Sequence, residues 1–428
     1  MVQIRPFRSL HYNTSRFSDW NSLVFQRELP FDFSGLFSQR RLYPIEKILA
    51  RIDKTDPKNS YQEARKLLRD FQRNNILIRD QYPFIYVYYI SYQNKISGLK
   101  MVRRGFVALG KIEPYSALQE VCFTPPEKEI FLQLLQSTMM LFSPIVMLYQ
   151  DPQNQINELL ESFCEQQDPC LEVQYPQKET HQLFRISRRE CLKEVMHLMD
   201  SQTLLQMNLD PGYLALQEFK KEMSEKKFHF DWGMMLFFNL FDTVLFPTPH
   251  RLLKNILNLD HLQSELNQWF EVKYYPFEIE ADFSQAKQEF FEDLRIEGYG
   301  HKHFGIFFAG EKKFQLLKMK EKEVSMSLSE QQWPNFLKKL DAMILDRFLI
   351  KKMLQHQVQY LSDIDDALQN VLQGEYQVVF FLNSLTSHQL KEVLQEKQIF
   401  PPGFLGLNTT PLAGLLIQPL EEEGEALS

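Results

Sequence analysis

Glycine is the residue that this chain most clearly lacks. Only 15 of the 428 residues are glycine, which is about half of the roughly 7% share that is usual in proteins. Glycine permits backbone conformations with positive φ and lets the backbone approach a phosphate group closely. The shortage therefore argues against an enzyme that is built around a glycine-rich nucleotide loop.

Cysteines and long apolar runs are also scarce. The N-terminal residues contain no long apolar core and hence no evident signal peptide, so we expect reduced thiols in a cytoplasmic protein. The most apolar stretch, residues 234–246, is too short to span a bilayer and contains Asn239 and Asp242. No membrane association is expected. The four cysteines are Cys122, Cys164, Cys170 and Cys191.

Neither sign of charge dominates the chain. Lys and Arg number 48 and Asp and Glu number 55, which gives a formal net charge of -7. A protein that binds nucleic acid by bulk electrostatics needs basic patches and a high pI, so no nucleic-acid partner is expected. The hydrophobic share of 44% and the charged share of 24% are close to those of globular proteins, which excludes global disorder.

Helical and strand patterns alternate along the chain. Residues 83–92 and 101–109 are rich in β-branched and aromatic side chains and predict a hairpin. Capping boxes at Ser60–Glu63 and Thr124–Glu127 and the pair Asp210-Pro211 predict helix starts. Further helices are predicted at residues 188–199, 260–270, 283–294, 329–354, 363–372 and 387–396, and strands at 145–149, 203–207, 234–246 (one strand or a pair), 272–277, 304–308, 314–319 and 377–382.

This alternation predicts an α+β protein of two domains with mixed sheets and flanking helices. The boundary is expected where Pro247-Thr248-Pro249 interrupts the pattern. We expect an N-terminal α+β domain over residues 1–245 and a C-terminal α+β domain over residues 246–420. The acidic residues 421–428 are expected to form a frayed tail.

Two clusters have the residue types of a metal site. His301 and His303 would share one face of a strand, but no further ligand lies nearby in the sequence, and polar residues entering a hairpin are the simpler interpretation. The carboxylates of residues 363–366 follow Ser362 at a predicted helix start, where negative charge is favoured without any metal. No metal site and no cofactor is predicted. The pair Arg103-Arg104 is too short to form a nucleic-acid patch.

His250 and Arg251 are the more promising polar residues. They follow a proline-punctuated turn at the end of a very apolar strand, a position where α/β sheets often place ligands. Arg251 could hold an anion bidentately, and His250 could carry a proton. The alternative is an interdomain linker in which Arg251 pairs with a surface carboxylate.

The order of several segments resembles a family known as domain of unknown function 1015. The resemblance covers nearly the whole chain, through segments that are individually weak but jointly specific. The matching segments are residues 2–12 (VQIRPFRSLHY), 106–109 (FVAL), 143–149 (SPIVMLY), 238–251 (FNLFDTVLFPTPHR), 340–345 (LDAMIL), 379–386 (VFFLNSLT), Pro401-Pro402 and 414–416 (GLL).

The polar signatures of that family are mostly missing. Its Asp-Gly-His-His-Arg loop, which resembles the signature of the ParB-like nucleotide-binding fold and its serine-kinase relatives, is replaced here by residues 208–212 (NLDPG). The family also has a His-Glu pair that is followed by a Thr and, downstream, by an Asp-Arg pair, and of these residues only Glu120 is kept here. Near the C-terminus, Gly403-Phe404-Leu405 stands where a Lys-Ser-Thr run is usual. Asp32 survives within Pro30–Phe33, and His250-Arg251 is retained.

The resemblance therefore implies a divergent member whose site has been emptied. Phosphate chemistry needs cations or N–H donors where charge develops, and these positions have become apolar, glycine or amide. The main hypothesis is a binding or interaction protein without catalysis, acting beside an intact paralogue or another protein. The alternative is a nucleotide-dependent phosphotransferase of the ParB-like serine kinase type with a site rebuilt from Asp32, Glu120, His250 and Arg251. A third hypothesis is a regulatory small-molecule binder with a phenylalanine-lined pocket.

Overall fold

The fold is given by a computed structural model, in which the chain divides into two compact units. The first unit contains residues 1–245 together with residues 409–428, and the second contains residues 246–408. The structure describes residues 2–16, 25–26, 57–93, 99–113, 127–175, 179–206, 210–242, 246–254, 256, 259–298, 302–320, 340–350, 358–386, 389, 392, 403–407 and 411–420. No helix among these is long and apolar enough to cross a membrane.

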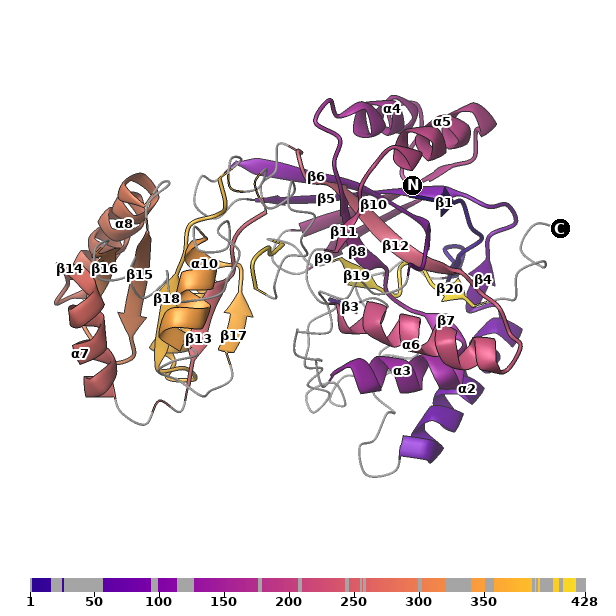
Figure 1. The fold of residues 1–428 in the computed structure, drawn as a ribbon. Helices are drawn as coiled ribbons and strands as arrows, with labels where there is room; N and C mark the ends of the chain where they lie inside the picture. Colours follow the sequence, from indigo (N-terminus) through magenta and orange to yellow (C-terminus); the bar gives the residue numbers. More distant parts are fainter. Residues whose placement is uncertain are drawn as a thin grey trace. The chain divides into compact units, whose positions relative to one another are not determined.

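An eight-stranded sheet forms the centre of the first unit (Figure 1). Its strand order is β11-β8-β12-β6-β5-β10-β9, and β1 also pairs with β6. Strands β8 and β12 run parallel, and the other described pairs are antiparallel, so this sheet is mixed as predicted. The strands are β1 (Ile4–Arg5), β5 (Ile85–Gln93), β6 (Lys100–Lys111), β8 (Ile145–Tyr149), β9 (Leu171–Tyr175), β10 (Glu179–Ile186), β11 (Leu205–Gln206) and β12 (Trp232–Asn239).

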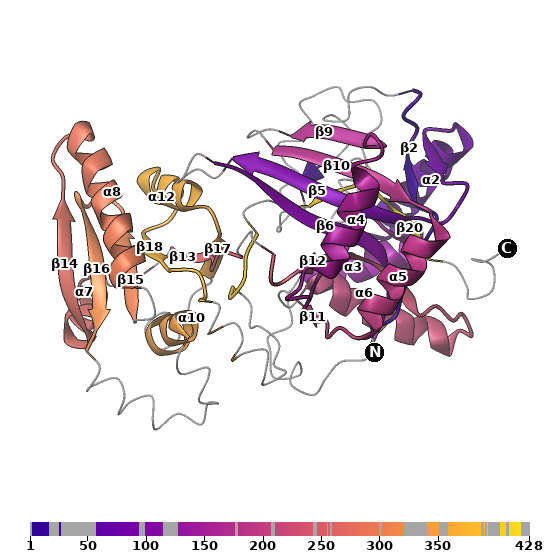
Figure 2. The same cartoon turned by 90° about the horizontal axis from the view of Figure 1, so that it is seen from above.

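Strand β12 is buried on both faces because helices cover both sides of the sheet. All eight of its residues are buried, which explains the continuous apolar run in the sequence. Figures 1 and 2 show α4 and α5 on one face of the sheet and α3 and α6 on the other. The helices are α2 (Pro57–Arg73), α3 (Glu127–Thr138), α4 (Gln155–Cys164), α5 (Arg189–Asp200) and α6 (Pro211–Glu225).

The C-terminal segment, residues 411–420, is part of the first unit. Strand β19 (Leu412–Ala413) pairs with β3 (Phe25–Gln26), and β20 (Gln418–Pro419) pairs with β7 (Met140–Leu141). The side-chain amide of Gln418 accepts the N–H of Met234 and donates to the carbonyl of Trp232, so it takes the place of a neighbouring strand beside β12. The assignment of residues 409–420 to the C-terminal domain is therefore wrong. The predicted acidic tail, residues 421–428, lies outside the described part of the chain.

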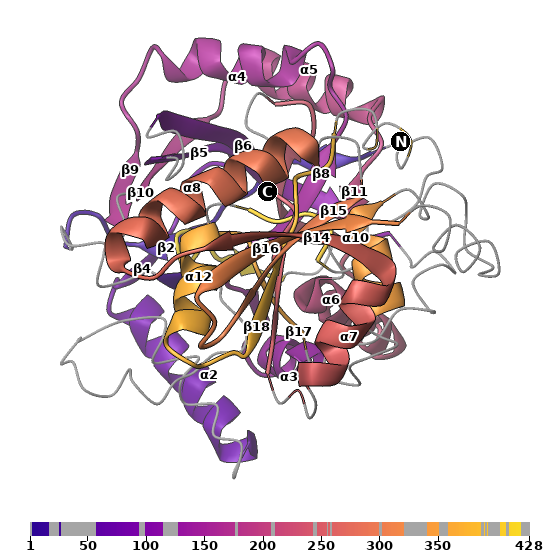
Figure 3. The same cartoon turned by 90° about the vertical axis from the view of Figure 1, so that its left-hand side faces the viewer.

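The second unit contains a six-stranded sheet of order β14-β16-β15-β18-β13-β17 (Figure 3). All its described strand pairs are antiparallel, whereas the sheet of the first unit is mixed. Its elements are β13 (His250–Leu253), α7 (Leu259–Trp269), β14 (Phe270–Pro276), α8 (Glu280–Glu297), β15 (His303–Phe308), β16 (Lys313–Met319), α10 (Asp341–Ile344), the π-helix η5 (Leu345–Ile350), β17 (Val358–Leu361), α12 (Ile364–Leu372) and β18 (Val378–Phe381).

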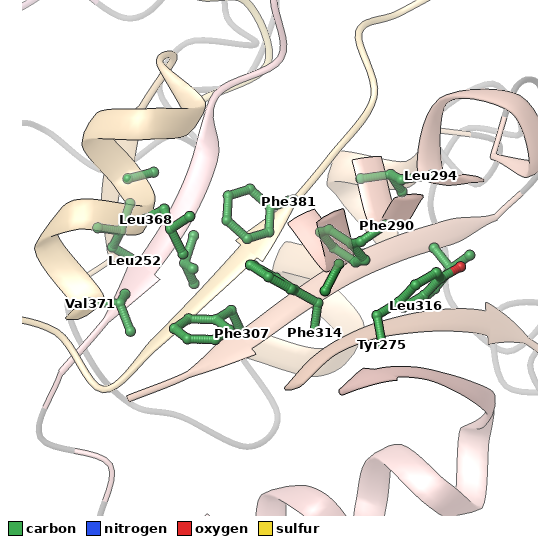
Figure 4. Close-up of a cluster of buried hydrophobic side chains, with 13 residues drawn as sticks. Leu252, Tyr275, Phe290, Leu294, Phe307, Phe314, Leu316, Leu368, Val371 and Phe381 are labelled. Carbon is green, nitrogen blue, oxygen red and sulfur yellow. The ribbon is translucent and has the colours of Figure 1, made fainter. Parts of the chain in front are cut away.

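Aromatic side chains fill the core between this sheet and helices α8 and α12 (Figure 4). Phe290 of α8 stacks on Phe314 at 5.0 Å between ring centroids and meets Phe381 edge-on at 5.9 Å. Leu368 and Val371 of α12 complete the same cluster. Many of the 36 phenylalanines thus serve packing. A phenylalanine-lined ligand pocket is not needed to explain them.

Three element predictions differ from the structure. Of residues 234–246, those that the structure describes contain one strand, β12, which agrees with the single-strand alternative but ends already at Asn239. Within the predicted helix 329–354, the described residues form the short helix α10 and the π-helix η5. Helix α2 begins at Pro57, so Ser60 lies inside the helix rather than just before it. The Thr124 capping box lies outside the described residues.

Two short strands of the first unit are paired with each other away from the main sheet. Strand β2 (Leu10–Tyr12) runs antiparallel to β4 (Leu77–Arg79). Leu10 also exchanges backbone hydrogen bonds with Ile417 of the C-terminal segment, at 2.9 Å in each direction. These contacts join residues from both ends of the sequence in one unit.

Candidate functional site

The start of helix α6 lies where the sequence resemblance expects the Asp-Gly-His-His-Arg loop of the family. Asp210 is the N-cap of this helix, and its Oδ1 accepts the N–H groups of Gly212 at 2.7 Å and Tyr213 at 3.1 Å. The predicted helix cap is confirmed. A phosphate at a helix N-terminus needs these free N–H donors and a positive local potential. Here a carboxylate takes two donors and supplies negative charge.

A second helix N-terminus lies at the carboxyl ends of the parallel strands β8 and β12, the usual ligand position of such sheets. Asp151 Oδ2 accepts the N–H of Ile156 in the first turn of α4, at 2.8 Å. Asn239 fixes this turn, because its side chain accepts the Asp151 N–H at 3.1 Å and donates to the Asp151 carbonyl at 2.8 Å. This helix start is also occupied by the chain's own carboxylate.

Arg103 is a buried charge that the sequence reasoning missed. It is 1% exposed and lies over the ring of Phe238, with Cζ 5.7 Å from the centroid. Burial lowers the pKa of its guanidinium, while the nearby Tyr92 and Asp242 oppose that shift and favour the charged form. Its neighbour Arg104 points to the other face and pairs with Glu161 of α4 at 3.3 Å. Two features of the sequence could have revealed this buried charge. Arg103 and Arg104 are consecutive residues of a predicted strand and therefore point to opposite faces of the sheet, and Asp242 is an acidic residue within the apolar run.

Arg251 forms an internal ion pair. It is fully buried on β13, and its Nε and Nη2 donate to the two carboxylate oxygens of Asp346 on η5, each at 2.9 Å. The guanidinium also donates to the Pro249 carbonyl and lies 5.2 Å from the ring centroid of Tyr360. Because these partners occupy its fork, Arg251 is not arranged to hold a ligand anion.

His250 lies on the opposite face of β13 from Arg251, as residues in sequence on a strand must. Its Nδ1 accepts the N–H of Leu382 at 3.3 Å, and its ring meets Phe381 edge-on at 5.2 Å. Burial, with a smaller contribution from the Arg251 charge, lowers the pKa of His250 to about 3. The imidazole is therefore neutral near pH 7 and is poorly suited to carry a proton there.

Two of the four predicted site residues lie in the part of the chain that the structure describes. Asp32 and Glu120 lie outside the described residues. His250 and Arg251 are adjacent, but they point to opposite faces of one strand and have internal partners. The two described residues thus do not share a cleft.

The metal candidates have structural roles in the part of the chain that the structure covers. His303 begins β15 as a buried residue, and His301 lies outside the described residues. Asp363 caps α12 by accepting the N–H of Asp366 at 2.9 Å, which confirms the capping interpretation, and Asp365 pairs with Lys287. No group of three or more His, Cys, Asp or Glu side chains in the described ranges could hold a metal ion. Cys164, Cys170 and Cys191 are free thiols.

The fold and these internal contacts define an α+β protein of two units with capped helix starts. Residues 4–343 match a family described as "Protein of unknown function (DUF1015)". The chain belongs to this family, as the sequence resemblance implied.

Solved structures share a distant likeness with the chain. A conserved hypothetical protein from Pyrococcus furiosus is 13% identical over 68% of this chain and 86% of that chain, with a TM-score of 0.29. A free serine kinase in complex with AMP is 12% identical over 70% of this chain and 83% of that chain, with a TM-score of 0.29. These low scores establish no shared activity. No curated protein matches the chain.

Proposed function

We propose that this chain is a binding or interaction protein that has lost phosphate chemistry. The observation that supports it most strongly is the Asp210 carboxylate at the start of α6, which accepts two backbone N–H groups there. An ionised carboxylate at this point repels a phosphate and competes for its donors. We further propose an intact relative of the same family, which keeps the Asp-Gly-His-His-Arg loop, as the partner.

Two further contacts support the proposal. Asp151 accepts one N–H group in the first turn of α4, where Asp210 accepts two at the start of α6. Arg251, the retained basic residue, is bound to Asp346 rather than free for a ligand. At these three places a carboxylate of the chain itself thus occupies donors that could otherwise bind an oxyanion.

A nucleotide titration separates this function from the competing phosphotransferase. Calorimetry with ATP, ADP and CTP in the presence of Mg²⁺ is expected to show no saturable binding to the wild-type chain. Mass spectrometry is expected to show no phosphorylated product with ATP or ADP as donor and free L-serine as acceptor. Saturable binding together with phosphoryl transfer would overturn the proposal and establish the phosphotransferase.

The proposed partner needs a test of its own. Native mass spectrometry of the full chain mixed with a family member that retains the loop is expected to show a complex of the two. The matched control is the same mixture with an unrelated protein of similar size. If the chain binds neither nucleotide nor the intact relative, this partner is wrong.

A further inference from the structure

Three strands of the first unit and the segment before one of them converge on Asp80, which follows strand β4. His11 comes from β2, Tyr86 from β5 and Arg185 from β10. Arg8 lies just before β2 in the sequence. None of these residues is among the candidate site residues discussed above, although Arg8 and His11 lie in the family-matching segment 2–12.

Asp80 is the centre of this cluster. Its Oδ1 lies 3.1 Å from Nε of Arg185 and 3.2 Å from Nε2 of His11, and its Oδ2 accepts the hydroxyl of Tyr86 at 2.6 Å. Its backbone carbonyl accepts Nε–H of Arg8 at 2.9 Å. Both guanidinium groups are therefore anchored on the same residue, one by the carboxylate and one by the main chain.

The cluster has more positive than negative charge. Burial alone would raise the pKa of Asp80, but His11, Tyr86 and Arg185 outweigh it and the pKa is lowered, so this carboxyl is ionised near pH 7. Burial raises the pKa of Tyr86, so its hydroxyl is neutral. Two guanidinium groups and one carboxylate lie in the cluster, which leaves a surplus of one positive charge without counting His11.

Solvent reaches the cations but hardly reaches their anchors. The side chain of Arg185 is 28% exposed, whereas those of Asp80 and His11 are 9% and 8% exposed. Nη2 of Arg185 lies 2.9 Å from Nε2 of His11, which together with Asp80 fixes the orientation of the guanidinium. An oriented guanidinium with further N–H donors matches the oxygens of a carboxylate or phosphate.

We propose that Arg8 and Arg185, held by Asp80 and His11, form a binding site for the oxyanion group of a small ligand, a carboxylate or a phosphate. The site goes beyond the proposed function, because it uses neither the start of α6 nor the retained His250-Arg251 pair. It is proposed for a small carboxylate or inorganic phosphate and not for a nucleotide, for which the proposed function expects no saturable binding. The buried anchors fix both cations before the ligand arrives, which reduces the entropy lost on binding.

Calorimetric or NMR titration of the full chain with inorganic phosphate, and separately with acetate, tests the site. Ionic strength is held constant with sodium chloride. Saturable binding of at least one anion is expected, and the stronger of the two identifies the oxyanion class. Arg185→Gln and Arg8→Gln are each expected to weaken binding tenfold or more, because each removes charge-assisted hydrogen bonds.

Arg104→Gln is the matched control. Arg104 is on the same sheet and is 30% exposed, close to the exposure of Arg185, but it pairs with Glu161 on the other face. This variant is expected to bind as the wild type does. Arg185→Lys keeps the positive charge and so tests whether lost binding in Arg185→Gln is only the result of misfolding. It is expected to bind the anion more weakly than the wild type, because lysine lacks the planar guanidinium with its parallel N–H donors. No saturable binding of either anion, or wild-type binding by both glutamine variants, would overturn the site.

Discussion

At the scale of single residues, buried ionisable side chains set the response of the second unit to pH. His250 has a pKa of about 3 in the folded chain against 6.5 as its ordinary value. Between these values the unfolded chain binds a proton that the folded chain does not. The stability that depends on neutral His250 is therefore complete above pH 6.5 and is lost progressively as the pH falls toward 3.

His250→Asn should flatten this pH dependence. An asparagine side chain can still accept the Leu382 N–H, but it does not titrate. The free energy of unfolding of the wild type should fall by about 2 kcal/mol more than that of the variant between pH 7.5 and pH 5. Urea unfolding at the two pH values measures this difference. Equal slopes for both proteins would contradict the assignment of a neutral, buried imidazole.

Asp210 offers a second prediction at this scale. Asp210→Ala removes the acceptor of two N–H groups at the start of α6 and should cost about 1 kcal/mol of stability. Asp210→Asn retains an acceptor and should cost less, which makes it the matched control. Urea unfolding of the two variants ranks them. A loss as large in the asparagine variant would show that charge, and not capping, determines the stability of this helix start.

The sequence predicts these residues unevenly, for a physical reason. Asp210 is predictable because a cap is a local contact, formed with residues two and three positions along the chain. The partner of Arg251 is not, because Asp346 lies 95 residues away and meets it only when η5 packs on β13. The convergence of Arg8, Asp80 and Arg185 is equally invisible before the strands are paired.

At the scale of elements, long regular patterns are predicted well. The hairpin of β5 and β6, the strand β8 and the helices α5, α7 and α12 lie within a few residues of their predicted bounds. Strand β13 has four residues directly after a proline-rich turn, and β17 also has four. Such short strands carry too few alternating positions for a pattern, and pairing with neighbours defines them.

A buried ion pair between Arg251 and Asp346 joins β13 to η5. Removing one partner leaves an uncompensated buried charge, so Asp346→Ala should cost about 3–5 kcal/mol of stability. The double variant Arg251→Met with Asp346→Ala should cost less than the sum of the single changes, since no charge is then stranded. Glu161→Ala, which breaks the half-exposed Arg104 pair, is the control and should cost at most about 1 kcal/mol. Additive losses at Arg251 and Asp346 would contradict the pairing.

In the first unit, the buried side chain of Gln418 makes a comparable contact between two elements, because it joins β20 to β12. Gln418→Ala strands the N–H of Met234 and the carbonyl of Trp232 in the interior and should cost about 2–4 kcal/mol. Gln182→Ala removes an exposed amide from β10 and should change stability by less than about 0.5 kcal/mol. Chemical unfolding compares the two variants. Similar small effects would mean that the Gln418 amide does not act as a strand partner.

At the scale of the whole molecule, one unit is formed by a continuous stretch of the chain and the other is not. The second is one contiguous stretch, residues 246–408, whereas the first needs residues from both sides of it. The sequence break near residue 245 is visible from the prolines. The return of residues 411–420 to the first unit is not, because no local pattern records which distant strand a short segment will pair with.

Deletion of residues 409–428 should therefore affect only one unit. Hydrogen exchange should accelerate at β5 and β12, which lose their contacts with Leu412 and Gln418, and should stay unchanged at β15 and β18. Deletion of residues 421–428 alone is the matched control and should leave both units protected. Mass spectrometry of the exchanged peptides resolves the two units. Acceleration at β15 and β18 as well would show that the units unfold together.

The return of the C-terminal segment also sets an order of events during synthesis. Domains usually fold as they leave the ribosome, the N-terminal one first. In this chain all six strands of the second sheet have been synthesised once Phe381 has left the ribosome. The hydrogen bond between β12 of the first unit and Gln418 can form only after residue 418 has also left it. Until then the backbone of β12 beside Met234 is open to another strand, which is a hazard for aggregation. The unit that is synthesised first is the last to be completed.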